Sequence, residues 1–456
     1  GGIQYSIYQH DNNNQLAQEL NEAAGFDYPT GVTWDGGALN AYVAVGGKFA
    51  DGRGHGSAFV GYRKIDELVK ASRDYFACAL DTGDDGPYCG GSGTIPRGRF
   101  LAFGPAPYYQ YVGDFVLTLE EEGCDGHSFR PRTGEYFNYG PYNHIQRPDE
   151  KWNAGGFANY TIDDHFEPYL EVMFMHDYSV AEIAPSGSFG NVSQINCDNP
   201  MLSEQQRDLI CTQAGYGPHD YANVAVLRRS VEGGSRTSRM INTNYRLVAG
   251  LRGDINESWS YDLYGLQTES MHQRTNINNL HPQRMANALD IVVDPVTSDW
   301  VCRSGDPGCV PWNIFQEGGV TQEALDYISA TALMDYSLET RVVNLIFTGD
   351  LEGYGLALPS ASEGIQIAVG GEYRSEFVAN RPDEVMMSGV GGSVGIQPVS
   401  AGYDVNELFI EALVPVVQDT KGFRDLSLEL GYRYSDYSTS GGSDTYKGLL
   451  NWAVTD

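Results

Sequence analysis

The residues whose types and spacing most directly indicate chemistry are cysteines. The chain has seven, and six of them form pairs that are close in sequence, in polar segments rich in glycine and aspartate. The pairs are Cys78 with Cys89, Cys197 with Cys211, and Cys302 with Cys309. None has the paired C-x-x-C spacing of a zinc site. Local pairs in such segments favour disulfide bonds that cross-link loops in an oxidising compartment over free thiols. Cys124 is left over.

One acidic segment supplies metal candidates. Asp81, Asp84 and Asp85 lie in the sequence DTGDDG, and carboxylate oxygens are ligands that Ca²⁺ prefers. The segment lacks the closing glutamate of an EF-hand loop. The three carboxylates are therefore calcium candidates without a complete ligand set.

Aromatic side chains supply candidates for ligand contact. Six tyrosines lie within one long predicted loop: Tyr108, Tyr109, Tyr111, Tyr136, Tyr139 and Tyr142. Such rings can stack on a sugar or on a planar siderophore, and they can equally pack the loops on one another. The sequence leaves both interpretations open.

No catalytic constellation stands out. His176 and Asp177 are adjacent, but they lie near the outer end of a predicted strand, where a polar pair is expected. No G-x-S-x-G elbow lies between a strand and a helix. We therefore predict a protein that is not an enzyme and that binds no cofactor.

The charge and hydropathy of the chain exclude several classes. The net charge is −31, which argues against binding to nucleic acid and against docking on anionic lipid through a basic patch. A cationic or neutral ligand is compatible with this charge, and so is the simpler need to keep long loops soluble. No stretch approaches 18 uninterrupted apolar residues, which excludes a transmembrane helix but not a membrane barrel.

The elements that must position these residues are strands, best seen at 426–452. Leu426, Leu428, Leu430, Tyr432 and Tyr434 form one row of alternate residues, and the other row is polar. A period of two places such rows on opposite faces of a strand. The pattern is typical of a half-solvated antiparallel sheet or of a membrane barrel with water or a plug inside.

Connections between the predicted strands alternate in length, which favours the membrane barrel. Short turns are predicted at 51–56, 163–166, 255–258, 351–362 and 417–422. Between them lie longer loops at 11–36, 69–149, 185–235, 273–332 and 379–402, with short helices near 15–24, 203–210, 283–290 and 321–329. The loop 69–149 is expected to be irregular, and 222–230 is expected to be a strand outside the main sheet. About twelve barrel strands result, spread over residues 1–456 as one region.

Several segments resemble the TonB-dependent outer-membrane receptors of Gram-negative bacteria, in particular the large alphaproteobacterial subgroup. They are spread over nearly the whole chain in the order of the family. The segments include ADGRGH (50–55), YNHIQRPDEKWNAGGFANYTIDDHFEPYLEVMFM (142–175), IAPSG (183–187), RRSVEGG (228–234), YRLVAGLRGDINESWSYD (245–262), CVPWNIF (309–315) and LELGYRYSDYS (428–438).

The resemblance implies a barrel of about 22 strands that is filled by a plug domain. It also implies a small nutrient ligand, a TonB energy-coupling complex as partner, and contact with outer-membrane lipid. Neither a plug nor an energy-coupling box is recognised in this sequence, so we expect a central portion of the barrel.

These observations predict a transmembrane antiparallel β-barrel with long extracellular loops, whose function is energy-coupled uptake of a siderophore, an oligosaccharide or a similar nutrient. Inward-facing arginines such as Arg246, Arg252 and Arg433 are expected to hydrogen-bond to carboxylates of a plug or of the lumen. Two alternatives stay open: a passive outer-membrane porin, and a secreted β-protein that binds carbohydrate.

Overall fold

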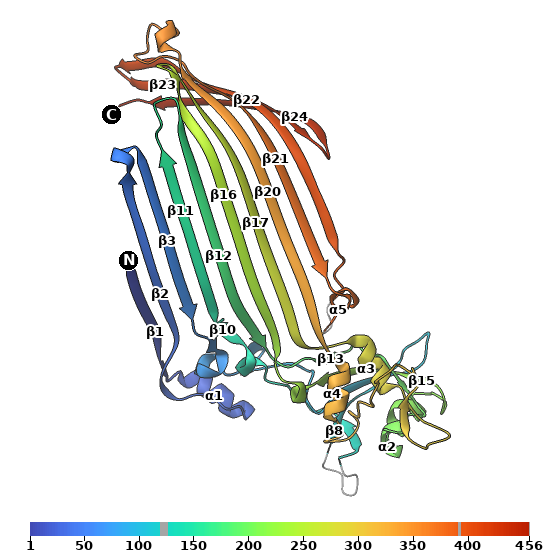
Figure 1. Cartoon of the computed structure of the whole chain (residues 1–456). Helices are drawn as coiled ribbons and strands as arrows, with labels where there is room; N and C mark the ends of the chain where they lie inside the picture. Colours follow the sequence, from blue (N-terminus) through green and yellow to red (C-terminus); the bar gives the residue numbers. More distant parts are fainter. Residues whose placement is uncertain (119–125, 391–393, 456) are drawn as a thin grey trace.

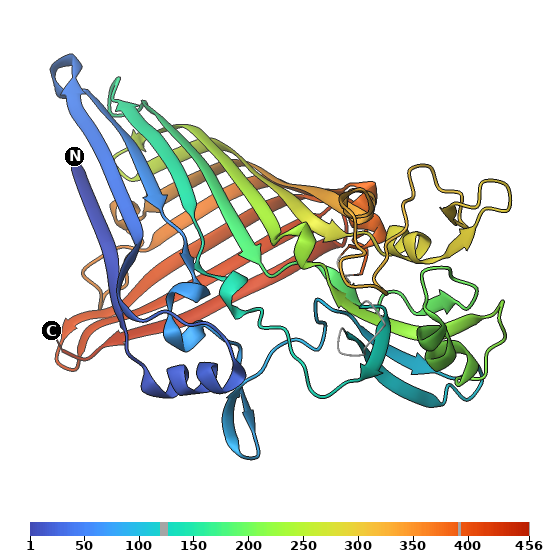
Figure 2. The same ribbon diagram turned by 90° about the horizontal axis from the view of Figure 1, so that it is seen from below.

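The dominant feature of the fold is one sheet of twelve antiparallel strands that follow one another in chain order (Figure 1). The computed structural model describes residues 1–118, 126–390 and 394–455. The strands are β1 (Gly2–Asn12), β2 (Gly31–Phe49), β3 (Gly54–Ile65), β11 (Asp149–Tyr160), β12 (Glu167–Ile183), β16 (Arg236–Asn256), β17 (Trp259–Leu280), β20 (Ser329–Asp350), β21 (Gln366–Pro382), β22 (Val399–Thr420), β23 (Phe423–Tyr437) and β24 (Gly441–Ala453). β1 and β24 form the two edges, and the sheet between them is curved (Figure 2). The predicted all-β antiparallel fold and its twelve main strands are confirmed.

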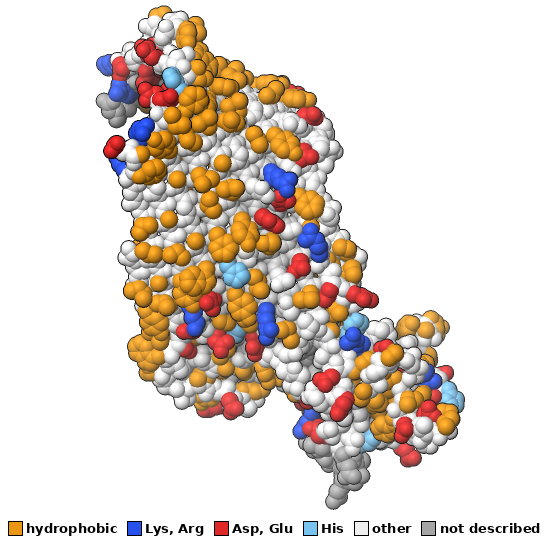
Figure 3. Space-filling view, viewed as in Figure 1, with side chains coloured by type: hydrophobic (Ala, Val, Ile, Leu, Met, Phe, Trp, Pro, Cys, Tyr) orange, Lys and Arg blue, Asp and Glu red, His pale blue; other side chains and the backbone are white. Residues whose placement is uncertain are grey.

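One face of this sheet is apolar, because the strand registers bring the apolar rows together. Val172 lies opposite Leu247, and Ile410 lies opposite Tyr432. Large exposed side chains of this face include Val60, Val172, Leu247, Leu263, Val343, Val369, Ile410, Leu430 and Leu450. Figure 3 shows hydrophobic side chains spread over this broad surface. The apolar row predicted at 426–434 lies on this face.

The opposite face is polar and carries ion pairs between neighbouring strands. Arg246 Nη1 lies 2.5 Å from Glu171 Oε2, and Arg252 Nη2 lies 2.5 Å from Glu167 Oε1. Arg433 Nη1 lies 3.3 Å from a carboxylate oxygen of Glu407 on β22. The three arginines predicted to face inward therefore form ion pairs with carboxylates on adjacent strands of the twelve-stranded sheet.

The apolar face does not extend over the whole length of the strands. On this face of β17, Leu263 is followed by the polar residues Gln267 and Glu269. On the same face of β20, the apolar Val343 is next to Arg341. The polar ends of the strands point toward the long connections. These strand ends reach into segments that were predicted to be loops, and β17 continues to Leu280. They were not predicted because a strand that is polar on both faces has no amphipathic signal.

The long connections all lie at one end of the sheet and the short ones at the other, as predicted, except that the short turn between β23 and β24 lies at the end with the long connections. The long connections carry the remaining elements, and α1 (Gln15–Ala24) confirms the first predicted helix. The others are β4 (Leu68–Val69), β5 (Leu80–Gly83), β6 (Gly86–Cys89), β7 (Arg99–Phe103), β8 (Tyr111–Thr118), β9 (Ser128–Pro131), β10 (His144–Gln146), β13 (Gly187–Phe189), β14 (Gln194–Asn196), α2 (Glu204–Arg207), β15 (Tyr221–Arg229), α3 (Pro282–Leu289), β18 (Ile291–Val293), β19 (Trp300–Cys302), α4 (Gln322–Ile328) and α5 (Glu384–Ser388). Among the described residues, no helix is long and apolar enough to cross a membrane.

The prediction that loop 69–149 is irregular was wrong. Its strands β7, β8 and β9 join β13, β14 and β15 of the next long loop in a second, six-stranded sheet. β15 confirms the strand predicted at 222–230 outside the main sheet. The sequence does not reveal this second sheet, because its strands are short and its two halves join through β7 and β15, which pair across more than a hundred residues of chain.

Candidate functional site

Three long connections fold together into one compact unit at the end of the main sheet. We call residues 95–118, 126–131, 187–229 and 280–328 the loop module. Its core takes Phe100 and Phe129 from the first connection, Met201 from the second, and Trp312 and Phe315 from the third. The rings of Phe100 and Phe129 lie 4.6 Å apart, and those of Phe100 and Phe315 lie 5.5 Å apart. The module is therefore a folded unit with its own hydrophobic core.

Buried amide side chains also join the second connection to the third. Asn199 Nδ2 donates a hydrogen bond to the Leu289 carbonyl at 2.7 Å, and Asn196 Nδ2 donates to the Ile291 carbonyl at 2.9 Å. Gln206 Nε2 donates to the carbonyl of Phe315 at 2.8 Å. Each bond joins a buried side-chain amide of the second connection to a backbone carbonyl of the third, and buried polar groups need such partners, so the contacts favour one arrangement of the two connections.

All three predicted disulfide bonds are present. Cys197–Cys211 and Cys302–Cys309 lie in the loop module, with Cα atoms 5.9 and 6.2 Å apart. Cys78–Cys89 closes the β5–β6 hairpin, with Cα atoms 5.6 Å apart. Cys124 lies outside the described residues.

The six candidate tyrosines do not form one site. Tyr108, Tyr109 and Tyr111 lie at the connection of β7 and β8, and Tyr108 is 88% exposed. Tyr136 and Tyr139 are also exposed, whereas Tyr142 is half-buried and packs against the ring of Phe137 at 5.6 Å. One of the six therefore supports the alternative that these rings pack the loops on one another.

Two of the tyrosines lie near a common cation. Arg99 forms an ion pair with Asp114 at 2.8 Å, and this contact raises the pKa of the guanidinium. Tyr111 and Tyr136 lie close enough to raise the pKa of Arg99 further. Arg132 also lies over the ring of Tyr136, with Cζ 5.0 Å from the ring centroid. Tyr111 and Tyr136 are therefore exposed rings that lie beside paired charges.

The three calcium candidates lie in the β5–β6 hairpin without converging. Asp81 accepts hydrogen bonds from the backbone N–H of Thr82 at 2.8 Å and from the Tyr88 hydroxyl at 3.4 Å. Within residues 1–118, 126–390 and 394–455, no group of three or more His, Cys, Asp or Glu side chains is arranged to hold a metal ion. The geometry of the described residues therefore does not support a calcium site formed by Asp81, Asp84 and Asp85.

A charged network crosses the surface of the loop module. Arg303 lies 2.9 Å from Asp198 and 3.0 Å from Asp290. Burial favours a higher pKa for Asp198, but hydrogen bonds from Asn196 and Arg303 lower it overall. Tyr221 donates a hydrogen bond to Asp290 at 3.0 Å. These contacts bind the second and third connections together at the surface, as the amides do in the core.

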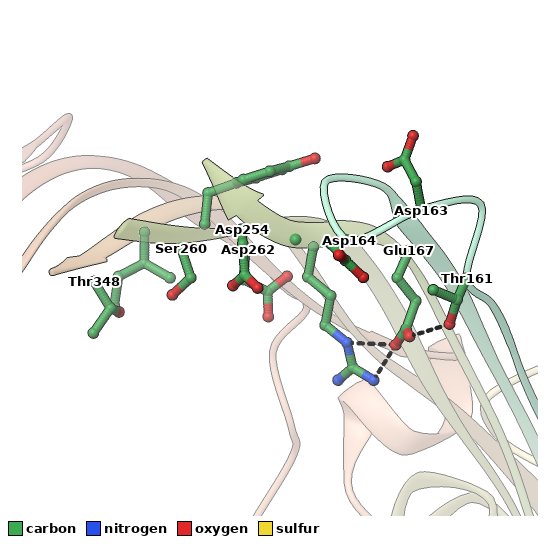
Figure 4. A pocket seen from close by; sticks show the side chains of 12 residues that line it. Thr161, Asp163, Asp164, Glu167, Asp254, Ser260, Asp262 and Thr348 are labelled. Carbon is green, nitrogen blue, oxygen red and sulfur yellow. Dashed lines mark hydrogen bonds and ion pairs between the residues drawn. The ribbon is translucent and has the colours of Figure 1, made fainter. Parts of the chain in front are cut away.

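The short-turn end of the polar face has a recess of about 440 Å³ (Figure 4). Arg252 and Thr161 both donate to Glu167 there, as the dashed lines show. The remaining charged lining residues are acidic, namely Asp163, Asp164, Asp254 and Asp262. The recess was not expected from the sequence, because it joins residues from turns that are far apart in the chain.

No family model matches the sequence, and no curated protein matches it. Solved structures with a related arrangement of strands include the ferric enterobactin receptor PfeA of Pseudomonas aeruginosa, with 11% identity and a TM-score of 0.40 over 100% of this chain and 41% of that one. The outer membrane transporter YddB of Escherichia coli gives 10% identity and a TM-score of 0.41 over 99% and 41% of the two chains. The siderophore receptor PirA of Acinetobacter baumannii gives 11% and 0.37 over 92% and 39%.

The chain spans about two fifths of the length of these receptors. At these identities and TM-scores, the likeness alone does not assign the chain to a family.

Proposed function

We propose that this chain forms part of the wall and the extracellular loops of a TonB-dependent transporter in a bacterial outer membrane. The transporter takes up a small nutrient, such as a siderophore or an oligosaccharide, with energy supplied through a TonB complex. The observation that carries the proposal is the apolar face of a twelve-stranded antiparallel sheet whose long connections all lie at one end.

The apolar face supports contact with lipid. Exposure of this large apolar face to water is unfavourable. In a bilayer the same side chains contact lipid tails, which are themselves apolar. Backbone groups that are unpaired in lipid cost several kcal/mol each, so the free edges of β1 and β24 need partner strands. We therefore place the sheet within a larger closed barrel whose polar face surrounds the lumen and meets a plug.

The loop module supports a binding role at the cell exterior. A ligand site needs side chains that are held in place before the ligand arrives, because ordering them on binding reduces affinity. Three connections that share a core, two disulfide bonds and buried amide contacts provide that rigidity. The exposed tyrosines of the β7–β8 connection are then available to a ring or a sugar face.

A matched pair of substitutions tests the membrane placement. Val172 and Met173 are adjacent on β12 and similarly exposed, but Val172 lies on the apolar face and Met173 on the polar one. Val172→Arg is expected to lower the stability of the assembled wall by about 2–4 kcal/mol, because it places a charge in lipid. Met173→Arg is expected to assemble nearly as well as the wild type. Folding is measured by heat-modifiable electrophoresis of outer-membrane fractions, and equal loss in both variants would contradict the placement.

Uptake measurements separate the transporter from its two alternatives. Cells that express the protein should accumulate a labelled nutrient only when TonB is present. Accumulation without TonB would indicate a passive channel instead. Recovery of the folded protein from the medium without detergent would indicate a secreted carbohydrate-binding protein.

A further inference from the structure

Two adjacent arginines at the junction of the loop module and the main sheet lack an acidic partner. Arg229 is the last residue of β15 and Arg236 is the first residue of β16, with the segment 230–235 between them. Both side chains lie near the ring of Phe189, so the two guanidinium groups are close to each other. The Cζ atom of Arg229 is 4.9 Å from that ring centroid, and the Cζ atom of Arg236 is 5.6 Å from it.

Arg229 is buried, with only 3% of its surface exposed. Its Nη1 atom donates to the carbonyl of Pro185 at 2.9 Å, while its Nε atom has no hydrogen-bond partner. A second ring, that of Phe137, lies 5.0 Å from its Cζ atom. The charge is therefore enclosed by aromatic rings and satisfied by one carbonyl, which leaves most of its desolvation cost without compensation.

Arg236 is half-buried and reaches the surface beside Arg229. Its Nε atom donates to the carbonyl of Ala184 at 2.9 Å, and no carboxylate of the described chain forms an ion pair with either arginine. Burial and then the proximity of Arg236 lower the pKa of Arg229 to about 10, so its guanidinium is still charged near neutral pH. Burial also lowers the pKa of Arg236.

Three arginines of the described chain are buried, namely Arg73, Arg228 and Arg229, and the first two form ion pairs with carboxylates whereas Arg229 does not. Arg228, the residue before Arg229, forms an ion pair with Glu232. Arg99 and Arg303 of the loop module also have acidic partners. In a chain with a net charge of −31, carboxylates are abundant, yet none neutralises Arg229 and Arg236.

We propose that Arg229 and Arg236 bind a carboxylate or phosphate group of a small molecule that enters beside Arg236. The guanidinium groups carry N–H donors for the oxygens of such a group, and Nε of Arg229 is one donor without a partner. Charge-assisted hydrogen bonds of this kind are about twice as strong as neutral ones. The rings of Phe137 and Phe189 exclude water and strengthen the attraction. The site does not depend on the transport function proposed above.

Anion titration of the intact protein, purified in detergent, tests the site. Citrate serves as the carboxylate probe and inorganic phosphate as the phosphate probe, with sodium chloride at matched ionic strength as the reference. At least one of the two probes should raise the melting temperature of the wild type by about 2 °C or more, because a ligand that binds only the folded state stabilises it. The probe that acts identifies the group that the site prefers.

Three variants assign the response to these residues. Arg236→Gln should weaken the apparent affinity for the probe about ten-fold, as expected when one charged hydrogen-bond donor is lost. Arg229→Met should abolish the response without lowering the melting temperature in chloride, because it removes a buried charge that has no partner. Arg303→Gln, which alters an arginine that already has two acidic partners, should respond as the wild type does.

Two outcomes would overturn the proposal. The first is that neither probe raises the melting temperature of the wild type above the chloride reference. The second is that Arg236→Gln and Arg229→Met retain the wild-type response, which would place any anion effect elsewhere in the protein.

Discussion

The twelve-stranded sheet and the six-stranded sheet of the loop module are both antiparallel, yet they place their apolar residues in opposite environments. β15 and β16 are consecutive strands that show the contrast. In β15 the alternate residues Ala222, Val224 and Val226 are fully buried. In β16 the corresponding row includes Tyr245 and Leu247, which are each 47% exposed.

Alternation of apolar and polar residues defines a face of a strand but does not determine what covers that face. Both strands have a period of two, and either could belong to the core of a water-soluble sheet. The row of β15 belongs to a core that also contains residues from two other connections, including Phe100 and Phe315. The row of β16 has no covering layer in the described chain, and it is the row that we propose to face lipid.

The largest predicted effect would remove part of the module core. Phe100→Ala deletes a fully buried ring that contacts Phe129 and Phe315, and a cost of about 3–5 kcal/mol in module stability is expected. Leu247→Ala on the main sheet is expected to change stability by less than about 0.5 kcal/mol, because this exposed side chain contacts no protein layer. Denaturation in detergent, followed by proteolysis of each region, measures both effects. Equal losses would refute the contrast between the two sheets.

A smaller effect is expected from opening the disulfide bonds of the module. Replacement of Cys197 and Cys211 by serine should lower module stability by about 3 kcal/mol, because the bond closes a loop with a sequence separation of 14 residues. The pair Cys302 and Cys309 has a separation of 7 residues and should contribute about 0.6 kcal/mol less.

The urea concentration at which each double variant becomes sensitive to protease gives the two values. The strands of the main sheet should keep the wild-type protection in both variants. A common loss of protection in the two sheets would show that the module and the wall unfold as one unit.

The main sheet could be predicted from the sequence because each strand carries its own signal. The row from Leu426 to Tyr434 identified both its strand and its apolar face, and short turns rich in glycine and aspartate separated it from its neighbours. The strand ends were missed where both rows became polar, as in β17 beyond Glu269. Local alternation thus predicts a strand only where its two faces differ.

The loop module could not be predicted, because its stability comes from contacts between distant residues. Phe100 and Phe315 are separated by more than two hundred positions, and nothing near either residue indicates that they meet. The disulfide bonds were the exception, since both partners of each bond lie in one short segment. Arg229 illustrates the same limit for the site: its sequence neighbours do not reveal that Phe137 and Phe189 enclose it.

The smallest predicted effect concerns pH and is confined to the edge of the six-stranded sheet. Glu135 follows β9 and accepts hydrogen bonds from Arg130, from the hydroxyl of Thr133 at 3.1 Å and from the backbone N–H of Thr133 at 3.0 Å. Burial favours a higher pKa for Glu135, but these hydrogen bonds and one from its own backbone lower the pKa to about 2. Since the folded state holds the ionised carboxylate, it gains stability above the ordinary pKa of 4.5 and loses that gain as the pH falls toward 2.

Glu135→Gln isolates this contribution, because it keeps the size of the side chain and removes its titration. Above pH 4.5 the wild type should hold β9 more stably than the variant by roughly 1–2 kcal/mol, a value reduced for partial solvent exposure. Hydrogen exchange of the backbone amides of β9 measures the difference, which should close between about pH 4.5 and 2. The main sheet should show no such change, because the hydrogen bonds of the Glu135 carboxylate are all with Arg130, Thr133 and its own backbone. A difference that persists unchanged at pH 2 would mean that packing, and not the charge of Glu135, holds this edge of the module.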